Sequence, residues 1–260
     1  MQNYIRYKNT AIAYSDSGTG IPVVLLHGFL ENSKMWKHIS LHLETTNRVI
    51  AIDLLGHGNT QCIGDIHTMK DMALAVKAVL KYLNIKQSYI IGHSMGGYVS
   101  LAFAEEYPKQ IKGICLLNST AQQDSPERKK LRSKACKIAT NNYQNLVKIA
   151  ISSLFNKVAK KQFSIEIEAL KKEALKTPFQ GYINATKGMQ LRNNKEIVLK
   201  NIKKKMIIAG KNDTILSYEN IVEEAHRTQT PLVKITCGHM PHIEQKEELL
   251  QKIKEFIKTD

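Results

Sequence analysis

Six short aliphatic runs, separated by stretches with helical periodicity, constrain the fold of this chain more than any other feature. Each run is mostly Val, Ile and Leu, which is typical of strands buried on both faces of a parallel sheet. Strands that alternate with helices predict a doubly wound α/β architecture. The six runs are residues 22–26, 49–52, 89–91, 111–117, 206–209 and 232–235.

The segments around these runs complete the predicted order of elements. Residues 4–15 alternate apolar and polar side chains and end at the turn sequence 16–20, as two short antiparallel strands would. Helical periodicity predicts helices at 35–43, 68–83 and 95–107. We therefore expect a mostly parallel sheet that is flanked by helices.

Residues 121–199 interrupt the alternation. No strand run occurs in this segment, and its periodicity is helical throughout. Ser125 and Pro126 match an N-cap and a first helical position. We predict that residues 121–199 are a helical cap (lid) inserted into an α/β core domain formed by residues 1–120 and 200–260.

The formal net charge of +15 is concentrated in one stretch: residues 121–210 hold 20 Lys and Arg against 6 Asp and Glu. A solvated helix face accounts for such a distribution, and attraction of an anionic substrate or a nucleic-acid or membrane surface are the alternatives. The lysines are not interleaved with aromatic residues as a single-strand binding platform requires. We therefore expect a small-molecule substrate, and neither a nucleic-acid nor a membrane partner.

The composition predicts neither a membrane anchor nor a metal site. The first residues lack the apolar core of a signal peptide, and no window approaches the roughly 18 apolar residues of a membrane span. We expect a cytoplasmic protein without metal or cofactor. The four cysteines are far apart and are not clustered with histidines at zinc-ligand spacing, so they are expected to be buried or incidental thiols. They are Cys62, Cys115, Cys136 and Cys237.

The motif Gly-His-Ser-Met-Gly-Gly at residues 92–97 points to a nucleophile. It follows a strand run and opens the predicted helix 95–107. In such a strand–turn–helix unit the central serine takes a strained conformation, and the flanking glycines avoid collisions. We predict that Ser94 is the nucleophile. The alternative is a glycine-rich connecting turn, which has no need for a small polar residue between two glycines.

A serine hydroxyl needs a base within hydrogen-bond reach and a third group that orients the base. Asp213 and His239 lie in the loops after the last two strand runs, at the edge where open α/β sheets build their sites. The chain order Ser94, Asp213, His239 matches a known order of the Ser–His–Asp triad. We predict that His239 is the base and Asp213 its orienting group, with His242 in a supporting or helix-leading role. For Asp213 the alternative is an ordinary turn aspartate.

The sequence His27-Gly28-Phe29 follows the first parallel strand run. The backbone N–H groups of Phe29 and Met95 are the predicted oxyanion-hole donors, and loss of one such donor typically costs about 10²–10³ in rate. His27 is expected to be a structural histidine, hydrogen-bonded beneath the loop. Trp36 either lines the mouth of the pocket or packs in the core.

These motifs together resemble the α/β-hydrolase family over nearly the whole chain. The resemblance implies an eight-stranded, mostly parallel sheet with a helical cap after the sixth strand. It also implies that His239, which follows a glycine in the last motif, is the catalytic histidine. The motifs are HGF at 27–29, DLLGHG at 53–58, GHSMGG at 92–97, GKND at 210–213 and CGHMPHIEQ at 237–245.

The predicted reaction is acyl transfer to water through an acyl-enzyme. Ser94 stands where epoxide hydrolases and haloalkane dehalogenases of this fold have an aspartate, and Met95 where proline aminopeptidases usually have tryptophan. We therefore expect a carboxylesterase-like serine hydrolase that cleaves a small-molecule ester or thioester. The alternatives are a triad-dependent lyase or carbon–carbon bond hydrolase acting on an anionic substrate, and a ligand-binding signalling module with an idle triad. The sequence leaves the substrate and the oligomeric state open.

Overall fold

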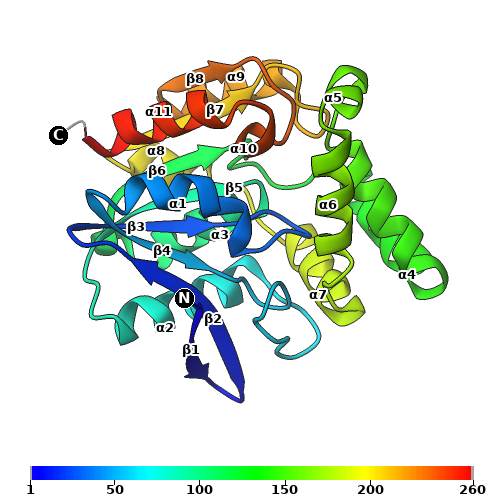
Figure 1. Cartoon of the computed structure of the whole chain (residues 1–260), viewed down its shortest axis with the longest axis horizontal. Helices are drawn as coiled ribbons and strands as arrows, with labels where there is room; N and C mark the ends of the chain where they lie inside the picture. The colour runs from blue at the N-terminus through cyan, green and yellow to red at the C-terminus, as the bar shows by residue number, and fades with distance from the viewer. Residues whose placement is uncertain (1, 259–260) are drawn as a thin grey trace.

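The computed structural model describes residues 2–258, which contain one eight-stranded sheet in the order β1-β2-β4-β3-β5-β6-β7-β8 (Figure 1). The pairs β1–β2 and β2–β4 are antiparallel, and every pair from β4 to β8 is parallel. The predicted sheet is confirmed. The strands are β1 (Gln2–Tyr7), β2 (Thr10–Ser17), β3 (Ile21–Leu26), β4 (Asn47–Ile52), β5 (Ser88–His93), β6 (Ile111–Leu117), β7 (Lys205–Gly210) and β8 (Leu232–Ile235).

Helices follow the strands in the predicted alternation. The helix expected at 35–43 begins as a 3₁₀ turn, because the Met35 N–H donates to the carbonyl of Asn32, three residues back. Helices α9 and α11 come in addition to those predicted. Outside the segment between β6 and β7, the helices are η1 (Ser33–Trp36), α1 (Lys37–Leu43), α2 (Met69–Tyr82), α3 (Met95–Glu106), η2 (Pro108–Gln110), α9 (Tyr218–Thr228), α10 (Pro241–Glu244) and α11 (Lys246–Lys258).

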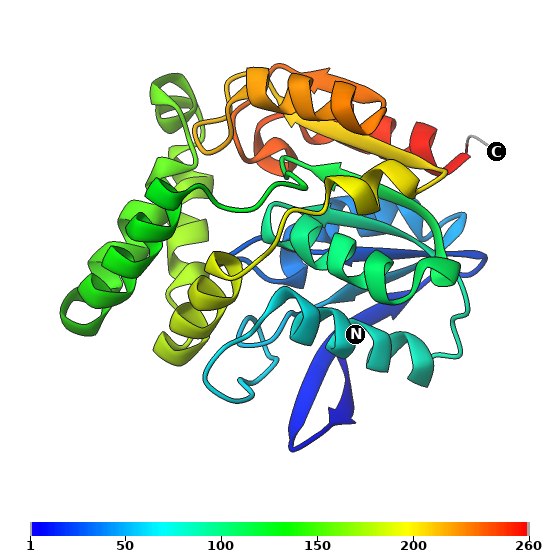
Figure 2. The same ribbon diagram turned by 180° about the vertical axis from the view of Figure 1, so that it is seen from behind.

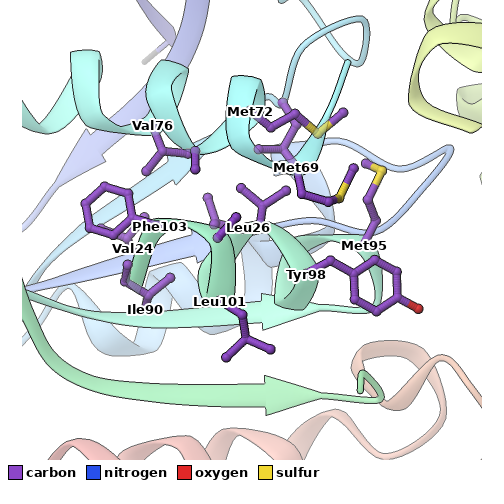
Figure 3. Close-up of a cluster of buried hydrophobic side chains, with 14 of the residues drawn as sticks. Val24, Leu26, Met69, Met72, Val76, Ile90, Met95, Tyr98, Leu101 and Phe103 are labelled. Atoms are coloured by element: carbon purple, nitrogen blue, oxygen red, sulfur yellow. The ribbon is translucent and has the colours of Figure 1, made fainter. Parts of the chain in front are cut away.

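The two faces of the sheet are buried under different helices. Along β3, Val24 and Leu26 belong to a core that includes side chains of α2 and α3, whereas Val23 and Leu25 belong to a core with α1 and α11. Figure 3 shows side chains of α2 and α3 packed over Val24, Leu26 and Ile90. Successive strand residues point to opposite faces, so burial on both sides explains why the strand runs are aliphatic. Trp36 is fully buried in the second core and therefore packs.

Five helices fill the chain between β6 and β7, and Figures 1 and 2 show α4 to α7 beyond the carboxyl ends of the central strands. Ser125 caps α4 by accepting the Arg128 N–H, and Pro126 occupies the first turn, as predicted. A non-helical residue, Asn142, interrupts α4. None of the helices within residues 2–258 is long and apolar enough to cross a membrane. The five are α4 (Pro126–Ser153), α5 (Lys157–Gln162), α6 (Ser164–Ala174), α7 (Phe179–Gln190) and α8 (Glu196–Asn201).

Helix α7 is fixed directly against the loop after β4. The Asn184 side chain donates to the Gly64 carbonyl at 2.8 Å, and the Asn184 carbonyl accepts the His67 N–H at 3.1 Å. A Cβ atom at Gly188 would lie 1.7 Å from the His67 carbonyl oxygen. The close approach of α7 to the loop after β4 therefore depends on the absence of a side chain at Gly188.

We expect Gly188→Ala to destabilise the protein by about 1–3 kcal/mol, the usual cost of overpacking. In an open helix the same change stabilises by roughly 0.5–1 kcal/mol, because glycine loses more backbone entropy on folding. Urea denaturation therefore distinguishes overpacking from an open helix position by the sign of the change in the free energy of unfolding. A more stable variant would show that α7 does not press on His67.

Candidate active site

The candidate site lies where the sheet changes its direction of growth. From β3 the chain continues to β4 on one side, whereas β5 lies on the other side of β3 and leads on to β6. The loops after β3 and β5 therefore diverge, and such a switch point forms the binding crevice of open α/β sheets. A cavity of about 160 Å³ at this point is lined by Phe29, Ser94 and His239. Three larger hollows, of about 470, 590 and 570 Å³, are lined by other described residues that do not include the predicted nucleophile.

Ser94 occupies the strained turn that the motif predicts. Its φ and ψ are 49° and −112°, and it directly precedes α3. A Cβ atom at Gly96 would lie 2.2 Å from the Leu26 carbonyl oxygen, so this helix end can approach β3 only without a side chain there. The Ser94 carbonyl accepts the hydroxyl of Ser119 at 2.7 Å. The strain at Ser94 is thus held by packing and hydrogen bonds around it.

The structure brings Ser94, His239 and Asp213 into one hydrogen-bonded chain. His239 Nδ1 lies 2.8 Å from Asp213 Oδ2, and His239 Nε2 lies 3.1 Å from Ser94 Oγ. An ionised carboxylate can only accept, so Nδ1 donates to Asp213 and Nε2 is left to accept the serine proton. The Asp213 and His239 side chains are each only 3% exposed. This geometry can withdraw a proton from Ser94 as its oxygen attacks.

Asp213 is held by further donors. Its Oδ1 accepts the N–H groups of Ile215 and Leu216, and its Oδ2 accepts the Asn118 side-chain amide at 2.8 Å. Burial alone would raise the pKa of Asp213, but His239 and these donors outweigh burial and lower the pKa. The carboxylate is therefore ionised at neutral pH. Asn118 was not among the predicted site residues, since only the pairing of β6 with β7 brings it beside Asp213.

The two predicted oxyanion donors, Phe29 and Met95, follow β3 and Ser94. Within residues 2–258, the backbone hydrogen bonds of loops and helix ends include none donated by either N–H. The Met95 N–H lies at the first turn of α3, where the helix dipole favours negative charge. Among these bonds, neither N–H group has an acceptor, as the prediction of oxyanion donors requires.

A buried ion pair, missed from the sequence, joins three loops of the site. Glu31 Oε2 accepts the Gly28 N–H at 2.8 Å and lies 2.7 Å from His93 Nδ1, while His93 Nε2 donates to the His239 carbonyl at 3.0 Å. Burial would lower the pKa of His93, but the Glu31 carboxylate outweighs it and the pKa is raised. Burial would raise the pKa of Glu31, and His93 instead lowers it to about 2. His93 is therefore an imidazolium that donates from both nitrogens. We call Glu31 and His93 the brace.

The other buried histidines nearby are neutral. His27 Nε2 accepts the Leu54 N–H at 2.9 Å, so His27 supports the loop from beneath, as predicted. Burial lowers the pKa of His57 to about 3 and that of His242 to about 4. His242 Nε2 lies 3.5 Å from Glu31, which agrees with a supporting role. Within the described part of the chain, no group of three or more His, Cys, Asp and Glu side chains could hold a metal ion.

The sequence matches the profile of the alpha/beta hydrolase fold family over residues 21–246, and the chain belongs to that family. It is similar to a thermophilic esterase from Thermogutta terrifontis, solved with malate bound, at 30% identity and a TM-score of 0.92, covering 99% of this chain and 98% of the other. The structure of the enol-lactonase from Burkholderia xenovorans LB400 is 19% identical in sequence, with a TM-score of 0.91, and the match covers 99% of this chain and 100% of the other. At this identity the similarity shows the fold alone.

Curated sequences show the same relationship. The 3-oxoadipate enol-lactonase 1 of Acinetobacter baylyi is 25% identical over 230 residues, which are 86% of this chain and 84% of that protein. By contrast, the first five curated relatives are matched over only 27% to 41% of their own length, so the chain spans less than half of each. Esterases, enol-lactonases and other hydrolases are thus among its relatives, and the chain is a member of a hydrolase family.

We expect Glu31→Gln to lower the free energy of unfolding by about 1–3 kcal/mol, the cost of a buried acceptor left without a donor. Without the carboxylate, His93 loses its second proton and can donate to only one of its two acceptors. The Glu31 contribution is present above pH 4.5 and is lost as the pH falls toward 2. The His93 contribution is present below pH 6.5 and is lost as the pH rises through its raised pKa. The difference from wild type is therefore largest between about pH 4.5 and 6.5.

The matched control is Glu247→Gln, which removes an exposed carboxylate that lies 3.2 Å from the half-buried His38. A carboxylate in contact with water contributes little to such a pair, so the stability is expected to stay within about 0.5 kcal/mol of wild type. Both variants are compared by denaturant titration at several pH values. Equal effects of the two substitutions, or no pH dependence for Glu31→Gln, would contradict the charged state of the brace.

Proposed function

We propose that this protein is a serine hydrolase that cleaves a small-molecule ester or thioester through an acyl-enzyme. The observation that carries the proposal is the hydrogen-bonded chain from Asp213 through His239 to Ser94, which ends at the cavity. An adjacent base and an oriented carboxylate are what a serine hydroxyl needs to become nucleophilic at neutral pH. Membership in a hydrolase family and the similarity to an esterase support it.

The reaction follows from the arrangement of these groups. Ser94 Oγ attacks the carbonyl carbon while His239 Nε2 takes the hydroxyl proton, and the Phe29 and Met95 N–H groups bind the oxyanion. His239 then gives the proton to the leaving alcohol or thiol, which departs and leaves the acyl group on Ser94. A water molecule repeats the attack with His239 as base, and the acid is released. Asp213 stabilises the imidazolium and its orientation throughout.

The size of the cavity favours small substrates. Its volume of about 160 Å³ is below the roughly 300–1,000 Å³ of typical small-molecule pockets. Buried contacts hold the strained turn and the three residues of the hydrogen-bonded chain. The nucleophile is therefore already positioned before substrate binds. An enzyme needs preorganisation of this kind, whereas a module that only retains a ligand does not need it.

We expect a fluorophosphonate, which reacts with activated serines, to form one covalent adduct on the wild-type protein and none on Ser94→Ala. Intact mass spectrometry measures the adduct. Ser153→Ala removes another serine that lines the cavity and is expected to keep the adduct. Folded wild-type protein without any adduct would contradict the proposal and favour a ligand-binding module with an idle triad.

Asp213→Asn keeps the shape of the side chain but leaves His239 without its negative partner. Comparable substitutions in serine hydrolases lower kcat by about 10⁴. We expect the rate of labelling and the hydrolysis of 4-nitrophenyl acetate to fall by about 10³–10⁴, with the far-ultraviolet circular dichroism unchanged. A rate within tenfold of wild type would show that Asp213 is an ordinary turn residue.

A further inference from the structure

Two arginines of α4 line the same cavity as the nucleophile. Arg128 and Arg132 lie one helical turn apart, so they share the face of α4 that looks toward Ser94 and His239. The rest of the lining is mostly apolar and includes Leu154. The cavity therefore has an apolar part and a basic part, and neither arginine is needed for the acyl chemistry.

Positive charge exceeds negative charge around these arginines. The buried Asp124 carboxylate contacts three guanidinium groups: Arg132 Nε, Arg192 Nη1 at 2.7 Å and, more loosely, Arg128 Nε at 3.8 Å. One carboxylate can neutralise only one of the three charges. The cluster thus carries a surplus of two positive charges beside a partly enclosed cavity, where water screens them less than at an open surface.

Arg128 is the member of the cluster that is available to a ligand. Arg192 lies with its guanidinium carbon 3.9 Å above the Tyr98 ring, and its nitrogens also donate to the carbonyls of Gln122 and Met189. The Arg128 side chain is 39% exposed, and among the described residues its guanidinium donates one hydrogen bond, to the Ile215 carbonyl at 3.1 Å. Its remaining donors can turn to a group in the cavity.

The acidic groups of the site do not cancel this surplus. Glu31 also lines the cavity, but its charge is paired with the His93 imidazolium at 2.7 Å. The Asp213 carboxylate lies behind His239 and is held by its own donors. A substrate that enters the cavity therefore meets the charge of the arginine cluster.

We propose that Arg128, with Arg132 beside it, binds a carboxylate of the substrate, so that the enzyme acts on esters or thioesters that carry an anionic group near the scissile bond. The planar guanidinium can donate two parallel hydrogen bonds to a carboxylate, which a lysine ammonium cannot. This inference rests on the proposed function, since it names the class of substrate that Ser94 attacks.

The test uses fluorophosphonate labelling of Ser94 in competition with two isosteric pairs of esters. Monomethyl glutarate is compared with methyl 5-methylhexanoate, and acetoxyacetate with isobutyl acetate, so that each anionic ester has a neutral partner of the same shape. The measured quantity is the ester concentration that halves the rate of labelling, and it responds to binding as well as to turnover. The pairs place the charge on the acyl side or on the alcohol side of the ester.

We expect the anionic member of at least one pair to be effective at a concentration roughly tenfold lower than its neutral partner, a difference typical of charge-assisted hydrogen bonds. Arg128→Gln removes this preference, so that the anionic and neutral members of each pair become equally effective. Lys130→Gln, which removes the same charge from an exposed position of α4 outside the cavity, keeps the preference. Raising the NaCl concentration weakens it.

Two results would overturn the inference: no anionic preference in either pair, or a preference that Arg128→Gln leaves unchanged. If Arg128→Gln weakened the competition by both members of a pair equally, Arg128 would have a structural role instead. Failure of the proposed function is recognised separately, because Ser94 would then take no label even without a competing ester.

Discussion

The geometry of the site depends on one buried ion pair. Glu31 and His93 connect the loop after β3, the turn that carries Ser94 and the loop that carries His239, three segments far apart in the chain. Removing one member of a buried pair leaves the other without its partner and destabilises the folded state. The three loops therefore hold their positions together. The loop after β3 cannot move away from Ser94 without breaking a charged contact.

Local sequence was enough to predict most of the fold and the residues of the hydrogen-bonded chain. A strand buried on both faces must be aliphatic, and a tight turn around Ser94 needs glycine at Gly96, so both leave a pattern within a few residues. Asp213 and His239 could be predicted because each directly follows a strand run, and parallel strands bring their carboxyl ends to one edge. In all these cases, the sequence feature that makes the residue predictable lies next to it in the chain.

The residues that were missed owe their role to partners far along the chain. Glu31 and His93 are 62 positions apart, and Asn118 reaches Asp213 over 95 positions. In sequence, each of these is an ordinary polar residue at or after the end of a strand. Only the order of the strands decides which loops meet, and the resulting burial then turns a common Glu and His into a charged pair. Spacing alone cannot contain this information, since it arises from desolvation in the folded state.

The basic character of residues 121–210 separates in the structure into two kinds of charge. Most of the lysines there are exposed, so their charges are solvated and screened within about 10 Å at 0.1 M salt. Arg132 and Arg192 have only 14% and 6% of their side chains exposed, and they share Asp124 with Arg128 beside the cavity. The net charge counted from the sequence weights all these charges equally. A bound substrate, however, interacts most strongly with the charges that are nearest to it and least solvated. The few arginines at the cavity wall, not the many lysines, determine the electrostatic potential that a substrate meets near Ser94.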